Sequence, residues 1–324
     1  MNKTHFLYLL FFVFLSACQK KNDTLPRKTS GKINTISVII EDQLWNGEIG
    51  DSIRNKFASP VIGLPQEEPL FTINQYPVKL LEGFATDSRA IIVVKKGTKN
   101  SFEIKQNQYA SPQNVFHITG KTGAAIIDTL EKNTSKIIQI IRATEIAESQ
   151  RIINQSLLSP KIITNKFHIS LNVPSDYEYM LHKSKFIWLK KEIISGNTSL
   201  LIYQVPLHTI KAGNDEIASI VRMRDSIGKY IHGTEPNTAM ITEEGYAPYL
   251  FKTQLDGKKT YETRGTWELK NDFMAGSFIN YAIIDKAYNR ILVLEGFCYS
   301  PSKEKRDLMQ ELEAIIKSVH VIKR

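Results

Sequence analysis

Leu15, Ser16, Ala17 and Cys18 match, at all four places, the motif that directs lipid attachment in bacterial lipoproteins. In this chemistry the cysteine thiol takes a diacylglycerol, a peptidase that needs small residues before the cut releases a new amine, and the amine is usually acylated too. Each buried methylene contributes about 0.8 kcal/mol, so two or more chains give stable anchoring. The alternative is ordinary signal-peptide cleavage after Ala17. Leu15, three places before that cut, is bulkier than the small residue usually found there. The motif therefore predicts lipidation of Cys18.

The segment before this motif is a short leader. Residues 6–15 are apolar except for the hydroxyl of Tyr8. A spanning helix needs roughly 20 apolar residues, whereas a signal-peptide core has about 7–15. We therefore expect residues 1–17 to be a signal peptide. Residues 18–34 are polar, with little to bury, and predict a flexible, lipidated, basic tether.

The charge distribution changes the meaning of the formal net charge of +9. The leader holds one lysine, and the tether holds five basic residues against one acid, so about +4 remains on residues 35–324. The basic tether favours attraction to anionic lipid, on the order of 1 kcal/mol per residue near the surface. We therefore expect a membrane partner and no nucleic acid.

Other chemical motifs are incomplete. Gly120-Lys121-Thr122 resembles the end of a phosphate-binding loop, but Val115 stands where that loop needs a glycine. Ser226 and Ser300 each begin a Ser-x-x-Lys sequence, but the accompanying motifs occur in the wrong order. The seven histidines are scattered without pairing, so no metal site is expected, and no cofactor. Cys298 lies in an apolar run and predicts a packed free thiol, with a reactive thiol as the alternative.

The expected elements divide the body in two. Hydrophobic periodicity predicts strands and helices in residues 35–158 and again in 159–324. In the first half a proline-rich loop spans 59–77, and a helical tract with a break near Asn133 spans 123–157. In the second half a strand meander precedes a closing amphipathic helix at 302–319. Both halves end in hairpins, a strand and a helix. We therefore expect an α+β fold with two topologically similar units, each a mainly antiparallel sheet covered on one face by amphipathic helices.

Several long strings also resemble a known family. Taken together, they are similar to an uncharacterised lipoprotein family of Bacteroidetes-type bacteria, described as domain of unknown function 4837, over nearly the whole mature chain. The resemblance implies an envelope location in a diderm bacterium and assigns no activity, so no catalytic residue is carried over. Sorting rules of other diderms, applied to Gln19 after Cys18, favour the outer membrane, with the periplasmic or surface face left open. The strings are residues 44–47, 58–71, 265–268, 271–276 and 294–297.

Two segments are candidate binding surfaces. Long loops on rigid scaffolds often bind, which directs attention to the proline-rich loop 59–77. The second segment is a hairpin whose turn carries bulky apolar groups. In each case the alternative is a segment packed against the body. The candidate residues are Leu64, Glu67, Glu68, Leu70, Phe71, Trp267, Asp272, Phe273 and Met274.

Two functions follow from these features. The first is a non-enzymatic envelope lipoprotein that binds an envelope protein or glycan through both segments, because no catalytic constellation is recognisable. The second is an envelope hydrolase whose site is assembled from scattered carboxylates. A deep pocket with converging acids would favour the second function. The acids considered are Glu67, Glu68, Asp272 and Glu295.

Overall fold

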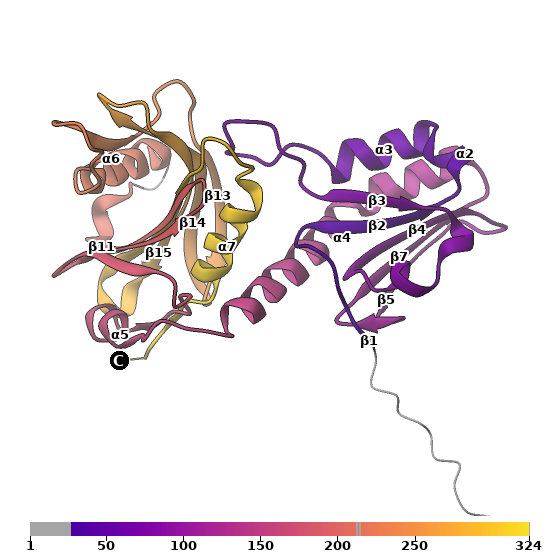
Figure 1. Ribbon diagram of the computed structural model, residues 1–324, viewed down its shortest axis with the longest axis horizontal. Coiled ribbons are helices and arrows are strands. Elements are labelled where there is room, and N and C mark those ends of the chain that lie inside the picture. Colours follow the sequence, from indigo (N-terminus) through magenta and orange to yellow (C-terminus); the bar gives the residue numbers. More distant parts are fainter. Residues whose placement is uncertain (1–26, 212, 214, 324) are drawn as a thin grey trace, which may run out of the picture.

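The chain forms two lobes in the computed structural model, which describes residues 27–323 except 212 and 214. Each lobe is built on a β-sheet with helices packed against it (Figure 1). This arrangement confirms the predicted α+β class. The predicted signal peptide, Cys18 and the tether up to residue 26 lie outside the described residues.

Residues 27–34, predicted as the end of a flexible tether, are packed on the first lobe. β1 (Arg27–Lys28) adds a short parallel strand there. The buried guanidinium of Arg89 donates to the carbonyl oxygens of Gly31 and Lys32 at 3.1 and 2.7 Å. The prediction was wrong for this stretch because it considered only side-chain burial. The backbone carbonyls of a polar segment can satisfy a buried cation equally well.

The first lobe holds a five-stranded sheet in the order β3-β2-β4-β7-β5. Only the β5–β7 hairpin is antiparallel, and the other three pairings are parallel. The prediction of a mainly antiparallel sheet is therefore wrong for this lobe. Residues 90–94 are a continuous buried apolar run, which is typical of a parallel strand covered on both faces. The strands are β2 (Thr35–Ile40), β3 (Thr72–Tyr76), β4 (Ala90–Lys96), β5 (Ser101–Gln106), β6 (Ala110–Ser111, paired with β1) and β7 (Asn114–Gly120).

Two helices cover one face of this sheet and enclose its main core. They are α3 (Glu48–Phe57), which follows the short α2 (Asp42–Trp45), and α4 (Gly123–Ile153). The Thr122 side chain caps α4 by accepting a hydrogen bond from an amide of the first turn. The predicted break near Asn133 does not occur, because the Asn133 amide donates to the carbonyl one turn earlier while the backbone ladder continues. The short helices η2 (Val78–Leu80) and η3 (Gly83–Thr86) lie in the segment between β3 and β4.

The second lobe holds an antiparallel sheet in the order β12-β14-β15-β16-β11-β10-β9, with β13 also paired to β14. Every pairing in it is antiparallel, which confirms the prediction for this half. The predicted meander accounts for its long central strands. The strands are β9 (Glu178–Lys183), β10 (Phe186–Ile193), β11 (Gly196–Val205), β12 (Ala239–Thr242), β13 (Tyr249–Leu255), β14 (Lys258–Lys270), β15 (Ala275–Asp285) and β16 (Arg290–Tyr299), and a separate pair is β8 (Ile169–Ser170) with β17 (His320–Val321).

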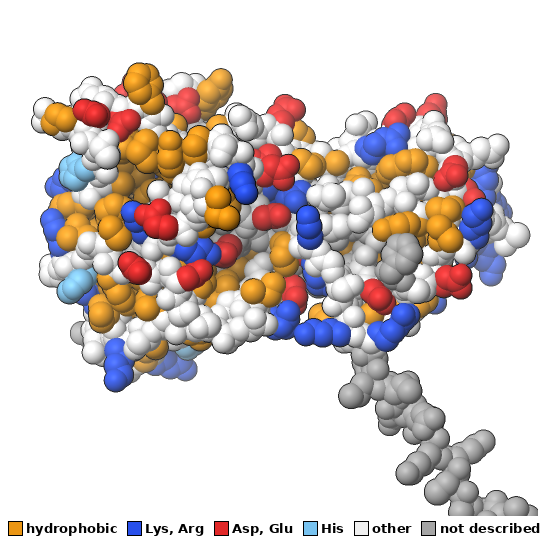
Figure 2. Space-filling model, viewed as in Figure 1, with side chains coloured by type: hydrophobic (Ala, Val, Ile, Leu, Met, Phe, Trp, Pro, Cys, Tyr) orange, Lys and Arg blue, Asp and Glu red, His pale blue; other side chains and the backbone are white. Residues whose placement is uncertain are grey.

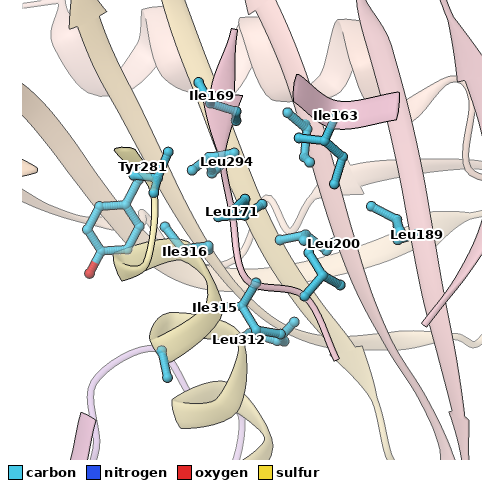
Figure 3. Packing of buried hydrophobic residues seen from close by; sticks show 14 of the residues in the cluster. Ile163, Ile169, Leu171, Leu189, Leu200, Tyr281, Leu294, Leu312, Ile315 and Ile316 are labelled. Atoms are coloured by element: carbon cyan, nitrogen blue, oxygen red, sulfur yellow. The ribbon is translucent and has the colours of Figure 1, made fainter. Parts of the chain in front are cut away.

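Helices cover both faces of this sheet, not one as predicted. Alternate residues of each central strand point to opposite faces. One face of the sheet, called the α7 face, packs against α7 (Arg306–Lys317) and α5 (Lys161–Phe167) and forms the α7-face core. Figure 3 shows Leu312 and Ile315 of α7 beside Leu200 of the sheet. The α6 face forms a second core around Trp267 and Phe297. The helices are α5 (Lys161–Phe167), α6 (Glu216–Gly228) and α7 (Arg306–Lys317), with η4 (Leu207–Thr209) and η5 (Lys286–Tyr288) as short turns.

The lobes meet through α4 and α7. α4 runs from the first lobe toward the second and packs against α7 (Figure 1). The buried carboxylate of Glu68, from the first lobe, accepts hydrogen bonds from the backbone amides of Lys305 and Arg306 at the start of α7, at 2.7–3.0 Å. Because one sheet is mostly parallel and the other antiparallel, the expected topological similarity of the two halves is wrong.

Candidate ligand-binding site

A cavity of about 440 Å³ lies at the junction of the lobes. Its floor is the α7 face of β13 and β14, one wall is α7, and the first lobe contributes α4 and the beginning of the 59–77 loop. Cavities of this size between domains are common ligand sites. In Figure 2 basic and acidic side chains gather along the junction. The lining residues are Asn34, Ser59, Pro60, Val61, Ile62, Leu70, Arg142, Phe251, Lys252, Thr253, Glu262, Arg264, Arg306, Met309, Gln310 and Glu313.

Strand register assembles the floor. Phe251 of β13 lies opposite Glu262 of β14, and Thr253 lies two residues further along the same strand. Side chains two residues apart share a face, so Glu262 and Arg264 point to the same side as Phe251 and Thr253. The floor therefore places an aromatic side chain beside a charged pair, with 2.6 Å between the Arg264 Nε and the Glu262 Oε1.

Glu313 of α7 is the centre of the charged network. Its carboxylate accepts from Arg142 at 3.0 Å, from Arg264 at 2.8 Å and from Lys317 at 2.6 Å. The Tyr281 hydroxyl donates to it at 3.3 Å. The Tyr281 ring lies at the edge of the α7-face core in Figure 3. Both carboxylate oxygens of Glu313 are thus fully used as acceptors.

The network determines the ionisation of its members. Burial acts to raise the pKa of Glu313, but the positive charges of Arg264, Arg142 and Lys317 outweigh it and hold the pKa well below 4.5. Burial acts to lower the pKa of Arg264, but the charges of Glu313 and Glu262 outweigh burial and raise this pKa above its ordinary value. Glu313 and Arg264 are therefore both charged at neutral pH.

Hydrogen-bond donors remain free in the cavity. The Gln310 side chain is 9% exposed, and its Nε2 atom has no hydrogen-bond partner in the part of the chain that the structure describes. Arg142, with a side chain 38% exposed, donates to protein groups there through its Nη2 alone. A buried donor without a partner is unusual in a native fold. The cavity wall thus offers donors and calls for a ligand that brings acceptors.

Apolar side chains surround these polar groups. Ile62 is 45% exposed and Phe251 is 40% exposed at the cavity, and Val61, Leu70 and Met309 complete the apolar lining. Lys252 directs its ammonium group to Glu216 at 2.8 Å, and Glu216 belongs to α6 on the other face. Arg306 likewise pairs with Asp307, which lies outside the lining. The charge at the cavity is therefore set by the Glu313 network, in which three cations are paired with two carboxylates. The arrangement suits an apolar group that carries an anion.

The predicted binding residues of the 59–77 loop lie in different environments in the structure. Leu70 lines the cavity, Leu64 is partly buried against the α7-face core, and Glu67 is exposed. Phe71 is 0% exposed within the first core, and Glu68 caps α7. The prediction that Phe71 and Glu68 lie on a binding surface was therefore wrong. Burial of the Phe71 ring and capping of the α7 amides by Glu68 are more favourable than exposing these side chains to solvent.

The predicted binding residues of the β14–β15 hairpin also lie in different environments. Trp267 is 2% exposed in the α6-face core, and its indole Nε1 donates to the carbonyl of Cys298 at 3.2 Å, so its placement on a surface was wrong. Met274 is partly buried beside the same core. Asp272 and Phe273 line a separate depression at the β14–β15 turn, where Phe273 is fully exposed. These two residues do not contribute to the inter-lobe cavity.

The acids proposed for a hydrolase do not converge. Glu68 caps α7, which packs on one face of the second sheet, whereas Glu295 pairs with Arg224 of α6 on the other face. Glu67 is exposed in the loop, and Asp272 lies at a hairpin turn where it accepts from the Phe273 amide at 2.6 Å. The sheet itself separates Glu68 from Glu295, so this set cannot act on one bond.

Cys298 is a packed thiol, as predicted. It is 0% exposed, and burial raises its pKa to about 11, so it is protonated at neutral pH. Within the described residues, no cluster of three or more metal-binding side chains occurs. In the same part of the chain, no helix is long and apolar enough to cross a membrane.

The residues that carry the site were not identified from the sequence. Gln310 and Glu313 lie inside the amphipathic stripe of α7, among buried residues such as Met309 and Leu312. Polar residues on an otherwise apolar stripe are a usable signal, because they must be satisfied by a partner. The sequence around Arg142 gives no such signal, because Arg142 falls on the polar side of a long amphipathic helix.

Two family models match the chain. The model of the family "Domain of unknown function (DUF4837)" matches residues 156–318, half of the chain, and that of "Domain of unknown function (DUF8532)" matches residues 29–154. No curated protein sequence matches the chain.

Two solved structures show a distant likeness to this chain. The Ran-binding protein Mog1p of Saccharomyces cerevisiae is 11% identical, with a TM-score of 0.31, and the alignment covers 48% of this chain and 91% of that one. LpqN of Mycobacterium tuberculosis, involved in cell envelope biogenesis, is 13% identical with a TM-score of 0.29, covering 48% and 83%.

Proposed function

The chain belongs to the family described as Domain of unknown function (DUF4837), and we propose that it is a lipid-anchored, non-catalytic binding protein of a bacterial envelope. It holds a segment of a partner protein in the cavity between its lobes. The anchor is Cys18, which follows a signal peptide and precedes a basic segment. Gln19 favours the outer membrane.

The cavity is the observation that carries this proposal. It combines apolar walls with one buried donor, the Gln310 amide, that has no partner among the described residues. The network around Glu313 is positioned by hydrogen bonds from both lobes, through Arg142 and Arg264, so the site is largely formed before a ligand arrives. Preorganised sites bind more tightly because less conformational entropy is lost.

A protein segment fits this cavity better than a glycan. Phe251 is the one aromatic side chain in the described lining. Of the two acidic side chains of the lining, Glu313 has both oxygens occupied and Glu262 has one oxygen bound by Arg264, which leaves few acceptors for sugar hydroxyls. Apolar side chains of a peptide match the exposed faces of Ile62 and Phe251.

Affinity capture from living cells tests the proposal. Full-length tagged protein is crosslinked, purified and compared with two tryptophan variants of β13. Thr253→Trp fills the cavity, whereas Gln254→Trp places the same ring on the opposite, exposed side of the strand. We expect a protein to co-purify in near-equal amount with wild type and Gln254→Trp, and at least fivefold less with Thr253→Trp.

Two results would contradict the proposal. One is equal recovery of the partner with both tryptophan variants, which would place binding elsewhere on the molecule. The other is the absence of any reproducible partner when the protein is correctly anchored. Cys18→Ala is the control for the anchor, and we expect that variant to be released from the membrane fraction.

A further inference from the structure

We infer that the inter-lobe cavity recognises a carboxylate flanked by apolar side chains, held by Gln310 and Arg142. The inference rests on the proposed function and specifies the chemistry of the bound segment. It follows from the balance of donors and acceptors in the lining. Glu313 has no acceptor capacity left, whereas Gln310 and Arg142 have donors to spare.

Gln310 is placed to meet a ligand rather than a protein group. It lies one helical turn from Arg306 and one turn from Glu313, so all three project from the same side of α7 into the cavity. Its amide Nε2 is buried without a partner. Leaving a buried donor unmet is costly, and the cost is removed when a bound oxygen accepts from it. A ligand oxygen next to α7 satisfies this condition.

Arg142 supplies the charge. Its Nη2 is bound to Glu313 at 3.0 Å, and its Nε and Nη1 have no partner among the described residues. A guanidinium presents its donors in a rigid planar fork that matches the two oxygens of a carboxylate. Because the side chain is only 38% exposed, such a pair is screened less than one at the open surface.

The charge and polarity of the lining select the ligand. In the Glu313 network three cations, Arg142, Arg264 and Lys317, are paired with two carboxylates, those of Glu262 and Glu313. The excess of one positive charge matches a single carboxylate and disfavours a cation. The apolar side chains of Ile62, Phe251 and Met309 surround the donors and favour apolar neighbours of the anion. A carboxylate of this kind occurs at the end of a polypeptide chain and on an acidic side chain within an apolar segment.

Peptide binding tests the inference directly. Fluorescence anisotropy with detergent-solubilised full-length protein compares short acetylated apolar peptides with a free or an amidated carboxyl terminus. A second pair carries an internal glutamate or glutamine between apolar residues and is amidated at its end. We expect one acid form to bind about tenfold more tightly than its neutral partner, which is the effect of one charge-assisted contact. The pair that responds identifies the source of the carboxylate.

Matched variants locate the contact. Gln310→Met and Arg142→Gln should each weaken the acid peptide about tenfold and reduce the preference for acid over neutral. Arg151→Gln is the control, because Arg151 lies on the same helix, is similarly exposed and pairs with Glu148, away from the cavity. Circular dichroism of each variant reports whether it remains folded, and Gln310→Met keeps the test valid if Arg142→Gln does not fold.

Three outcomes would overturn the inference. Equal binding of acid and neutral peptides would show that the anion is not recognised. Binding of decanoate without binding of any peptide would replace the peptide with a lipid. Binding of acid peptides that Gln310→Met and Arg142→Gln leave unchanged would move the carboxylate elsewhere. In each case the effect of Thr253→Trp on partner capture decides separately whether the cavity is the binding site.

Discussion

The two faces of the antiparallel sheet each carry a buried pair of an arginine and a glutamate. On the α6 face Arg224 meets Glu295 at 2.7 Å, and on the α7 face Arg264 meets Glu313 at 2.8 Å. The two pairs have the same chemistry and nearly the same separation. They differ in what surrounds them, and that difference separates a structural contact from a candidate site.

The pair on the α6 face is sealed. Both side chains are 1% exposed, and Arg224 donates through Nε and Nη2 to Glu295 and through Nη1 to Thr242. The guanidinium also lies 3.4 Å from the centre of the Phe278 ring. Both side chains are enclosed by these contacts, so the role of the pair is to hold α6 on the sheet.

The pair on the α7 face adjoins the cavity and is shared between the lobes. Arg142 comes from the first lobe, and Glu313 and Arg264 come from the second. Among the described residues, Arg142 donates through Nη2 alone, and the Nε2 of Gln310 beside it has no partner. The same kind of arginine–glutamate pair is therefore structural where it is enclosed, and is a candidate for binding where it borders a cavity.

The largest effect should come from breaking the sealed pair. Arg224→Met leaves the Glu295 carboxylate buried without its cation, which costs about 3–5 kcal/mol in the free energy of unfolding. Urea denaturation measures the loss. Arg222→Met is the control on the same helix, where the arginine is exposed, and it should change stability little. An unchanged unfolding midpoint for Arg224→Met would remove the structural role of the sealed pair.

Glu313→Gln should be nearly as damaging and should change the pH dependence. It leaves three cations without their shared carboxylate, at a cost of about 3 kcal/mol at neutral pH. Because the folded-state pKa of Glu313 is depressed, the wild-type stabilisation is present above 4.5 and is lost as the pH falls from 4.5 toward the lower, folded pKa. Urea titrations at several pH values should show a shallower acid slope for the variant. Parallel slopes would contradict the assigned ionisation.

Removing the cap between the lobes should have an intermediate effect. Glu68→Ala leaves the amides of Lys305 and Arg306 at the start of α7 unsatisfied, at a cost of about 1–2 kcal/mol. Thermal unfolding followed by circular dichroism measures it. The neighbouring Glu67→Ala changes an exposed side chain and should stay within about 0.5 kcal/mol. Equal effects of the two substitutions would show that the cap contributes nothing.

The smallest effect has the opposite sign. Gln310→Met keeps the length of the side chain and removes the unpartnered buried donor, so the free energy of unfolding should rise by about 1 kcal/mol. The same substitution should weaken ligand binding. A gain in stability with a loss of affinity is expected where a residue serves binding rather than folding. Lower stability would indicate that Gln310 already has a partner.

Local patterns predicted much of the second lobe and less of the first. The meander and the closing helix follow from alternation and from the 3.6-residue period, which are local properties. The parallel sheet of the first lobe requires pairing between strands separated by helices and loops, and a buried apolar run such as residues 90–94 does not reveal its direction.

The site could be predicted only in part. The 59–77 loop was predicted to be a candidate binding segment because of its length, and Leu70 of this loop lines the cavity. The exposed Phe273 was recognised as well, although it lies outside the cavity. The central contact, from Arg142 to Glu313, joins residues 171 positions apart. No local pattern encodes such a pairing, so it requires the folded arrangement of both lobes.

Photocrosslinking in living cells tests the central claim most directly. A photoreactive side chain at Thr253 lies in the cavity, and the same group at Gln254 points away from it. We predict that irradiation joins the full-length protein to one partner from position 253 and gives little of that adduct from position 254. Equal adducts from both positions, or an adduct from position 254 alone, would contradict binding between the lobes.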